Sequence, residues 1–248
     1  MSRTDIEAVA DQRGRRGRLA LTSDGPLGRG HLGARILSQR PGYARVALVA
    51  EGALLVAGDD ISVNITVGPG MRLDVVEPSG TVAYDMRGGS ARWQARVKLA
   101  PHARLTWQGQ TFVVSGGADV TRDVRVELAT GSVAVLRETL VLGRAGEPGG
   151  RLLQTSRATL DGHPLLAEEL DLGPSQPRPG ALGHCRVVDT VSVLGRRAPG
   201  RPPPAAGSHR LDLDGPGTLV RSLATEAHVG SLAPVWAAMT CDSDRELS

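Results

Sequence analysis

The chain has 248 residues, enough to bury a sizeable core in one large or two small domains. Its 40% hydrophobic content is too high for a disordered chain, and its net charge of +3, with only six aromatic residues, lacks the basic stripes and aromatic platforms of a nucleic-acid binder. The two cysteines form no disulfide framework, and no apolar run is long enough to span a bilayer.

The first part of the chain, residues 1–17, reads as a mobile N-terminal tail because it is polar and lacks the apolar core of a signal peptide. We therefore expect a cytoplasmic protein. The basic stretch "RGRRGR" at residues 13–18 is compatible with contacts to anions, although a solvated end explains it better. Residues 18–248 are expected to form a single β-rich domain.

From Tyr43 onward, short β-rich segments follow one another, separated by turn residues. Three of them have the same form, an alternating arm, a break and a second arm, and the breaks are "VGPG", "LAPH" and "LATG". Aligned on Val67, Leu99 and Leu128, these units are 32 and 29 residues apart. Repetition at this period predicts stacked β-hairpin layers, β-helix-like or sandwich-like, and a plain antiparallel sandwich is the alternative.

The rest of the chain adds a hairpin, a strand and a helix. Asp161-Gly162 predicts a tight hairpin turn, and residues 185–195 predict a further strand. The segment at 198–208 is rich in proline and is expected to be an extended loop. In residues 217–240, Leu219 and Leu223 have helical spacing, so this part is predicted to be helical. The fold class is therefore all-β with one or two C-terminal helices.

A search for catalytic motifs finds none. The only lysine, Lys98, does not stand in a P-loop, and no zinc, CxxC or serine-hydrolase motif is present. His184 and Cys185 are adjacent, but neighbours on a strand point to opposite faces, which disfavours a shared metal ion. Asp59 suits a turn. Glu168-Glu169 suit a solvated face.

Glu138 is the most informative carboxylate, because apolar residues flank it on both sides. If it faces inward it needs a partner, and Arg137 and Arg144 are the nearest candidates. A β-helical hydrolase that uses Asp59 and Glu138 as a carboxylate pair stays open, as does a β-rich binding module for a protein or another ligand.

The ordered series of motifs between Tyr43 and Trp236 resembles the urease accessory protein UreD family, also called UreH. The residues that carry the resemblance are Gly58 and Asp59, Gly68 and Gly70, Thr81 and Tyr84, Gly143 and Arg144, and His184. The chain departs from the family pattern where Val76, Pro78 and Val82 replace polar residues.

The resemblance implies a non-catalytic maturation factor with a mostly β fold. It implies binding to apo-urease and to a UreF-like protein that holds the GTPase UreG, with delivery of nickel to the urease active site. A polar interior passage would carry the ion, and no cofactor would be tightly bound. Under this reading Asp59 and Glu138 are the candidate transient ligands of Ni²⁺, since carboxylate oxygens hold nickel more weakly than imidazole or thiolate.

Overall fold

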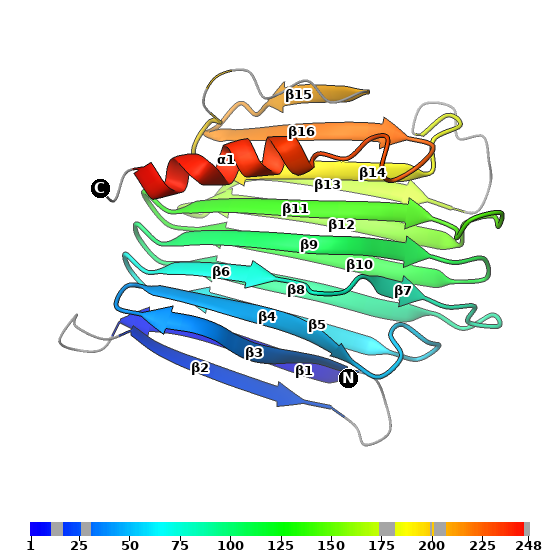
Figure 1. Cartoon of the computed structure of the whole chain (residues 1–248), viewed down its shortest axis with the longest axis horizontal. Coiled ribbons are helices and arrows are strands. Elements are labelled where there is room, and N and C mark those ends of the chain that lie inside the picture. Colours follow the sequence, from blue (N-terminus) through cyan, green and yellow to red (C-terminus); the bar gives the residue numbers. More distant parts are fainter. Residues whose placement is uncertain (11–16, 26–30, 174–181, 199, 201–206, 246–248) are drawn as a thin grey trace.

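A computed structural model describes the chain except for residues 11–16, 26–30, 174–181, 199, 201–206 and 246–248. The described residues form two stacked β-sheets and one helix (Figure 1). Sheet A has the strand order β13 (His163–Leu172), β12 (Arg151–Leu160), β10 (Asp119–Leu128), β8 (Ala91–Leu99), β5 (Asp60–Val67), β1 (Ser2–Ala10) and β2 (Gly17–Asp24).

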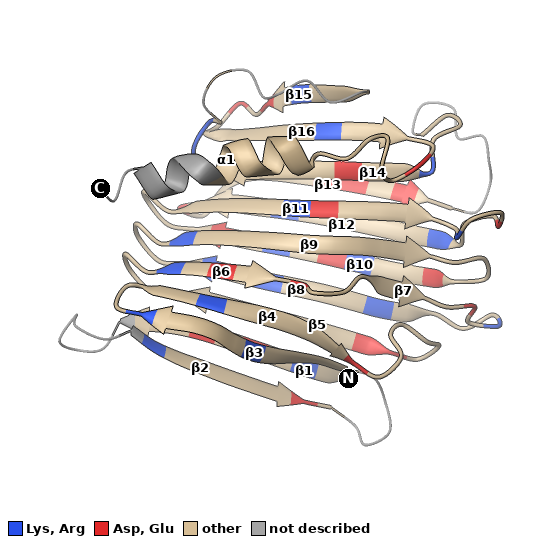
Figure 2. Cartoon of the chain, in the orientation of Figure 1, with Lys and Arg blue, Asp and Glu red and all other residues tan. Residues whose placement is uncertain are grey.

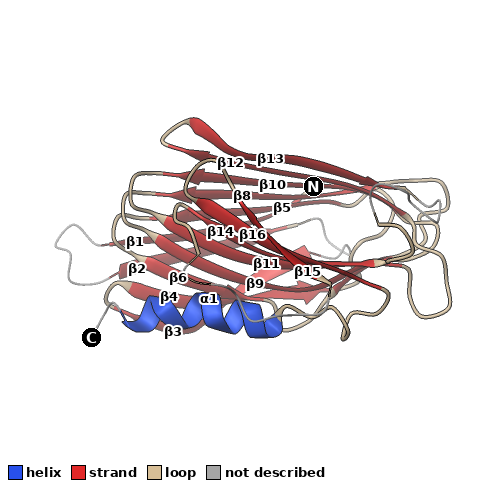
Figure 3. Cartoon of the chain, turned by 90° about the horizontal axis from the view of Figure 1, so that it is seen from above, coloured by secondary structure: helices blue, strands red, loops and turns tan. Residues whose placement is uncertain are grey.

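Sheet B lies against sheet A and has its own strand order, with α1 on its outer side (Figure 3). The order is β15 (Ser208–Asp212), β16 (Gly217–Ala224), β14 (Val187–Leu194), β11 (Val133–Leu142), β9 (Arg104–Val114), β6 (Arg72–Val76), β4 (Tyr43–Glu51) and β3 (His31–Arg40). The short strand β7 (Thr81–Ala83) also pairs with β9, and α1 spans Ala233–Arg245.

The chain alternates between the two sheets, so β5, β8 and β10 pair in parallel in sheet A while β6, β9 and β11 pair in parallel in sheet B. This arrangement is a β-solenoid, and it confirms the all-β, β-helix-like prediction. The alignment on Val67, Leu99 and Leu128 coincides with the strand register, in which Val67 faces Leu99 and Leu99 faces Leu128.

The repeated units are nevertheless not hairpins, and this part of the prediction is wrong. The two arms of each unit belong to different sheets, and the turn between them carries the chain across the core. The reason is that both arms are apolar on the face turned toward the other arm, and stacking buries both faces at once. The Asp161-Gly162 turn is a true hairpin between the antiparallel strands β12 and β13, as predicted.

The expected N-terminal tail is also wrong over the described residues, because β1 pairs with β5 and β2 inside sheet A. Ile6 and Ala8 are buried, together with the small polar residues Ser2 and Thr4. Charged residues on the outward positions hide this pattern in the sequence. Residues 11–16, which include most of "RGRRGR", lie outside the described part of the chain.

The predicted helix over 217–240 is wrong in its first third, since Gly217–Ala224 form strand β16. Leu219 lines the interior, whereas its neighbour Val220 packs beneath α1, so both faces of this strand are buried and its alternation is lost. The helix begins at Ala233. Val235 and Met239 of the helix, and Leu232 just before it, pack on apolar residues of sheet B. Most of the proline-rich segment 198–208 lies outside the described residues.

Candidate functional site

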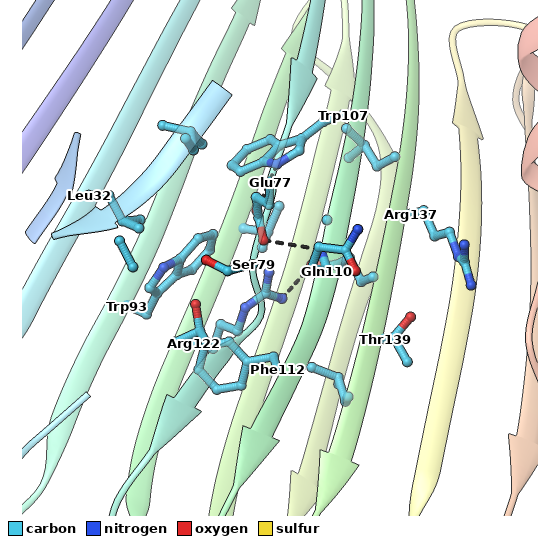
Figure 4. Close-up of a pocket in the computed structure, with 18 residues that line it drawn as sticks. Leu32, Glu77, Ser79, Trp93, Trp107, Gln110, Phe112, Arg122, Arg137 and Thr139 are labelled. Carbon is cyan, nitrogen blue, oxygen red and sulfur yellow. Dashed lines mark hydrogen bonds and ion pairs between the residues drawn. The ribbon is translucent and has the colours of Figure 1, made fainter. Parts of the chain in front are cut away.

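The interior between the two sheets is not uniformly apolar, and its polar part surrounds a cavity of about 30 Å³. Strands of both sheets supply its walls, which carry Glu77, Arg122, Glu138, Gln110 and Thr81 among aromatic and aliphatic side chains (Figure 4). A cavity of this size and polarity has room for a water molecule.

Glu77 lies at one side of this cavity, just beyond the end of β6. Its carboxylate accepts hydrogen bonds from the indole N–H of Trp107, at 2.9 Å, and from the backbone N–H of Gln110, at 3.1 Å (Figure 4). Burial raises the pKa of Glu77 above its ordinary value of about 4.5, and these hydrogen bonds together with the charge of Arg122 offset only part of that rise.

Arg122 crosses the space between the sheets. It projects from β10 of sheet A, is only 7% exposed, and pairs with Glu138 on β11 of sheet B. The same nitrogen donates to Gln154 Oε1 at 2.9 Å, and the guanidinium lies 4.3 Å above the ring of Trp93. Its Nε–H is buried and has no hydrogen-bond partner among the described residues, so it is available to a water or another acceptor in the cavity.

A second cavity of about 20 Å³ continues the polar interior toward the C-terminal strands. It shares Glu138 and Leu140 with the first cavity. At its far side Glu168 on β13 receives both terminal nitrogens of Arg221 on β16, each at 2.7 Å, which again links sheet A to sheet B. Glu77, Glu138 and Glu168 thus line two neighbouring interior cavities that share Glu138.

The sequence identified one of these three carboxylates correctly. Glu138 faces the interior and needs an arginine, as expected, but the arginine is Arg122. The two arginines named beforehand pair elsewhere, Arg137 with Asp189 and Arg144 with Glu147. Proximity in sequence misled here, because a partner on the other sheet is distant along the chain.

Asp59 lies apart from the residues that line the two cavities. It is 4% exposed, and its carboxylate accepts the backbone N–H of Val56 at 2.9 Å, which is the turn arrangement that its sequence context favours. The prediction that Glu168 and Glu169 lie on a solvated face is wrong for Glu168, which is half-buried in the second cavity. Its neighbour Glu169 is exposed.

Several of the remaining motif residues meet at the loops beyond β7 and β11. The Arg144 guanidinium lies 6.0 Å from the ring centre of Tyr84. The backbone carbonyl of Arg144 accepts a hydrogen bond from the Arg186 guanidinium at 2.8 Å. Gly143 has a φ of +79°, a conformation that favours glycine. His184 is exposed two residues before Arg186.

The other motif residues have separate places. Thr81 lines the first cavity, and Gly58 donates its N–H to the Ser90 carbonyl at 2.9 Å. Gly68 and Gly70 form the turn between β5 and β6. Val76, Pro78 and Val82, where the chain departs from the family pattern, do not line the first cavity. Glu77, Ser79 and Thr81 line it instead, so the cavity stays polar at this segment.

Sequence reasoning missed Glu77, Arg122 and Gln154, although the sequence held a signal for the first two. Arg122 shares the strand face of Val120 and Val124, and Glu77 continues the inward positions of Leu73 and Val75. A charged residue at an inward position of an alternating strand predicts an interior polar group.

Across the described residues, no three His, Cys, Asp or Glu side chains gather into a metal site. Over the same residues, no helix has the length and apolar character needed to cross a membrane.

The fold and the site define the chain as a β-solenoid with charged and polar side chains between its two sheets. Comparison with known proteins gives the family. The family model described as "UreD urease accessory protein" matches residues 17–241. The chain belongs to the UreD urease accessory protein family, which gives it a role in urease maturation.

Named relatives agree with this assignment. The chain is 52% identical over 185 residues to "Urease accessory protein UreD 1" of Streptomyces griseus, an overlap of 74% of this chain and 71% of the relative. It is 38% identical to "Urease accessory protein UreD" of Frankia alni, covering 73% and 69%. It is 36% identical to the Streptomyces coelicolor protein of the same name, covering 81% and 82%. The alternative of an unrelated β-rich module is therefore wrong.

Proposed function

We propose that this chain is a non-catalytic maturation factor that passes Ni²⁺ through its interior while it joins apo-urease to a UreF-like protein and a UreG-like GTPase. The observation that carries the interior part is the pair of cavities that share Glu138. Nickel is here the cargo, and it rests on no permanent ligand set.

Two features of this interior suit transfer more than storage. The carboxylates of Glu77, Glu138 and Glu168 offer oxygen ligands, which hold nickel more weakly than imidazole or thiolate. Two of the three are already paired with an arginine, Arg122 or Arg221. An arriving cation must compete with these guanidinium groups, so its residence at each step is short.

The test is urease activation with Glu138→Gln. Glutamine keeps the shape of the side chain and an oxygen that accepts from Arg122, but it removes the charge that attracts a cation. We expect soluble protein and intact partner binding, with a fall in nickel content and in urease activity of about tenfold, the effect of losing about 1.4 kcal/mol of stabilisation of the passing ion.

The neighbours Glu168 and Glu169 supply a matched comparison, because one lines the second cavity and the other is exposed on the same strand. Glu168→Gln should lower activation and Glu169→Gln should leave it unchanged. Full activation by Glu138→Gln, or equal losses from the two β13 variants, would show that the interior is not the route.

The scaffold part of the proposal is tested separately. Co-expression with the UreF-like protein should raise the soluble yield and give a complex that elutes as one species in size-exclusion chromatography. An isolated chain that is monodisperse and does not associate with that protein contradicts the scaffold role, whatever the result for Glu138→Gln.

A further inference from the structure

Gln154 on β12 is a buried polar residue that the proposed function does not use. It is 2% exposed, and it is the direct register partner of Arg122 on β10. Arg122 in turn is the register partner of Trp93 on β8. The three side chains therefore form one row on the inner face of sheet A, with the guanidinium between an aromatic ring and an amide. Trp93 and Arg122 line the first cavity (Figure 4), and Gln154 lines the second.

Hydrogen bonds on both sides fix the orientation of the Gln154 amide. Its Oε1 accepts a hydrogen bond from Arg122 at 2.9 Å, and its Nε2–H donates to the hydroxyl of Ser156 at 3.2 Å. A guanidinium can only donate, so the oxygen of the amide must face Arg122. The amide thus gives Arg122 a neutral acceptor beside the carboxylate of Glu138.

The two ion pairs that join the sheets differ in how firmly each arginine holds its carboxylate. Glu138 stands midway along β11 and Arg221 midway along β16, where Figure 2 shows an acidic and a basic position. Arg221 donates both terminal nitrogens to Glu168, each at 2.7 Å, and such paired donation is the strong form of this contact. Arg122 contacts Glu138 through one terminal nitrogen, which it shares with Gln154. Glu138 is therefore the carboxylate that is released more easily.

We infer that Gln154 is a positioning residue for cation transfer, because by sharing Arg122 it sets how readily Glu138 exchanges its arginine for a divalent cation. The inference rests on the proposed function and names the residue that adjusts one of its steps. A cation that binds Glu138 takes the carboxylate from Arg122, and a buried guanidinium without a partner is unfavourable. The amide oxygen of Gln154, and the face of Trp93 at 4.3 Å, remain in contact with the guanidinium and lower the cost of this exchange.

The experiment measures binding of Ni²⁺ to the full chain through the quenching of tryptophan fluorescence. The chain has three tryptophans, of which Trp93 and Trp107 line the first cavity while Trp236 lies on α1. Every chain tested carries Trp236→Phe, so the remaining signal comes from the interior. Nickel bound at exposed side chains far from the cavity then contributes little to the quenching.

Two variants withdraw the neutral acceptor from Arg122. Gln154→Leu removes it, and the milder Gln154→Asn shortens the side chain so that its oxygen no longer reaches the guanidinium. The matched control is Thr155→Val, because Thr155 is also buried but its side chain points to the opposite face of the same strand. Circular dichroism and thermal melting check that each variant keeps the β fold.

We expect Gln154→Leu to raise the apparent Kd for Ni²⁺ by about tenfold and Gln154→Asn by about threefold, as for the loss of one hydrogen bond to a charged group. Thr155→Val should stay within about twofold of the unchanged chain. In a chain that carries Arg122→Gln, Gln154→Leu should have no further effect, because the residue acts through the arginine.

Two results would overturn the inference while the interior ligand stands. One is unchanged Ni²⁺ binding in both Gln154 variants when Glu138→Gln weakens it. The other is an effect of Gln154→Leu that persists in full without Arg122. A different result, quenching that Glu138→Gln leaves unchanged or that is absent from the unchanged chain, contradicts the proposed function itself and the inference with it.

Discussion

A buried carboxylate, that of Asp189 on β14, helps to attach the segment that leads into α1 to sheet B. Asp189 is 1% exposed. It accepts two hydrogen bonds from the guanidinium of Arg137, at 2.8 and 3.3 Å, one from the hydroxyl of Thr139 at 3.2 Å, and one from the backbone N–H of Leu232 at 2.8 Å. Arg137 also donates to Ser231 at 3.2 Å, so the network joins β11, β14 and the start of the helix.

Replacement of Asp189 by alanine should destabilise the protein by about 3–5 kcal/mol. Removal of one partner of a buried pair leaves the other charge uncompensated, and this loss dominates the smaller contribution of each single hydrogen bond. The Arg137 side chain is 13% exposed, so water cannot replace the lost carboxylate fully. For a chain of this length the melting temperature should fall by on the order of 10 °C.

Urea unfolding followed by tryptophan fluorescence measures this loss, because Trp236 lies on α1 while Trp93 and Trp107 lie in the interior. The matched control is Glu127→Ala, which breaks an exposed pair with Lys98 and should cost less than about 1 kcal/mol. If the loss for Asp189→Ala is as small as that for the control, the network does not anchor the helix and the reasoning is refuted.

Two further predictions concern the interior and the turns. Burial raises the pKa of Glu77, so the folded chain keeps the carboxyl proton to a higher pH than the unfolded chain. The stability of the fold should therefore decrease as the pH rises from about 4.5 through the raised pKa. Glu77→Gln should remove this part of the decrease in melting temperatures measured between pH 4 and 8. An equal fall in the variant would contradict the assignment. His102 has a φ of +60° at the turn position that Gly70 and Gly131 occupy in the neighbouring units. His102→Gly should therefore raise the free energy of unfolding, measured by urea titration, by about 0.5–1 kcal/mol. A lower free energy of unfolding in the variant would refute this prediction.

The β-solenoid could be predicted to a large extent because the amino-acid sequence itself repeats. The alignment on Val67, Leu99 and Leu128 gave the register of sheet A, and an alternating strand has only one way to bury its apolar face. The alternation does not reveal whether two consecutive arms pair with each other or stack across a core. That choice depends on contacts with units about thirty residues away, which is why the arms were read as hairpins.

The candidate site was harder to predict, because its residues come from different units. Glu138 was found from its apolar flanks, but Arg122, its partner, is sixteen residues earlier and on the other sheet. The sequence interpretation places Glu168 and Glu169 together on a solvated face, although neighbours on a strand face opposite sides. Parity along each strand would have separated the inward carboxylate from the outward one.

The polar interior is difficult to explain by stability alone. Arg122–Glu138 and Arg221–Glu168 each join the two sheets, and replacing a buried ion pair by well-packed apolar residues is often neutral or stabilising. The unpartnered Nε–H of Arg122 adds a further cost. A core selected only for stability would lack both the pairs and the cavities beside them. That both pairs line the two cavities therefore supports the proposal that a charged species passes through the interior.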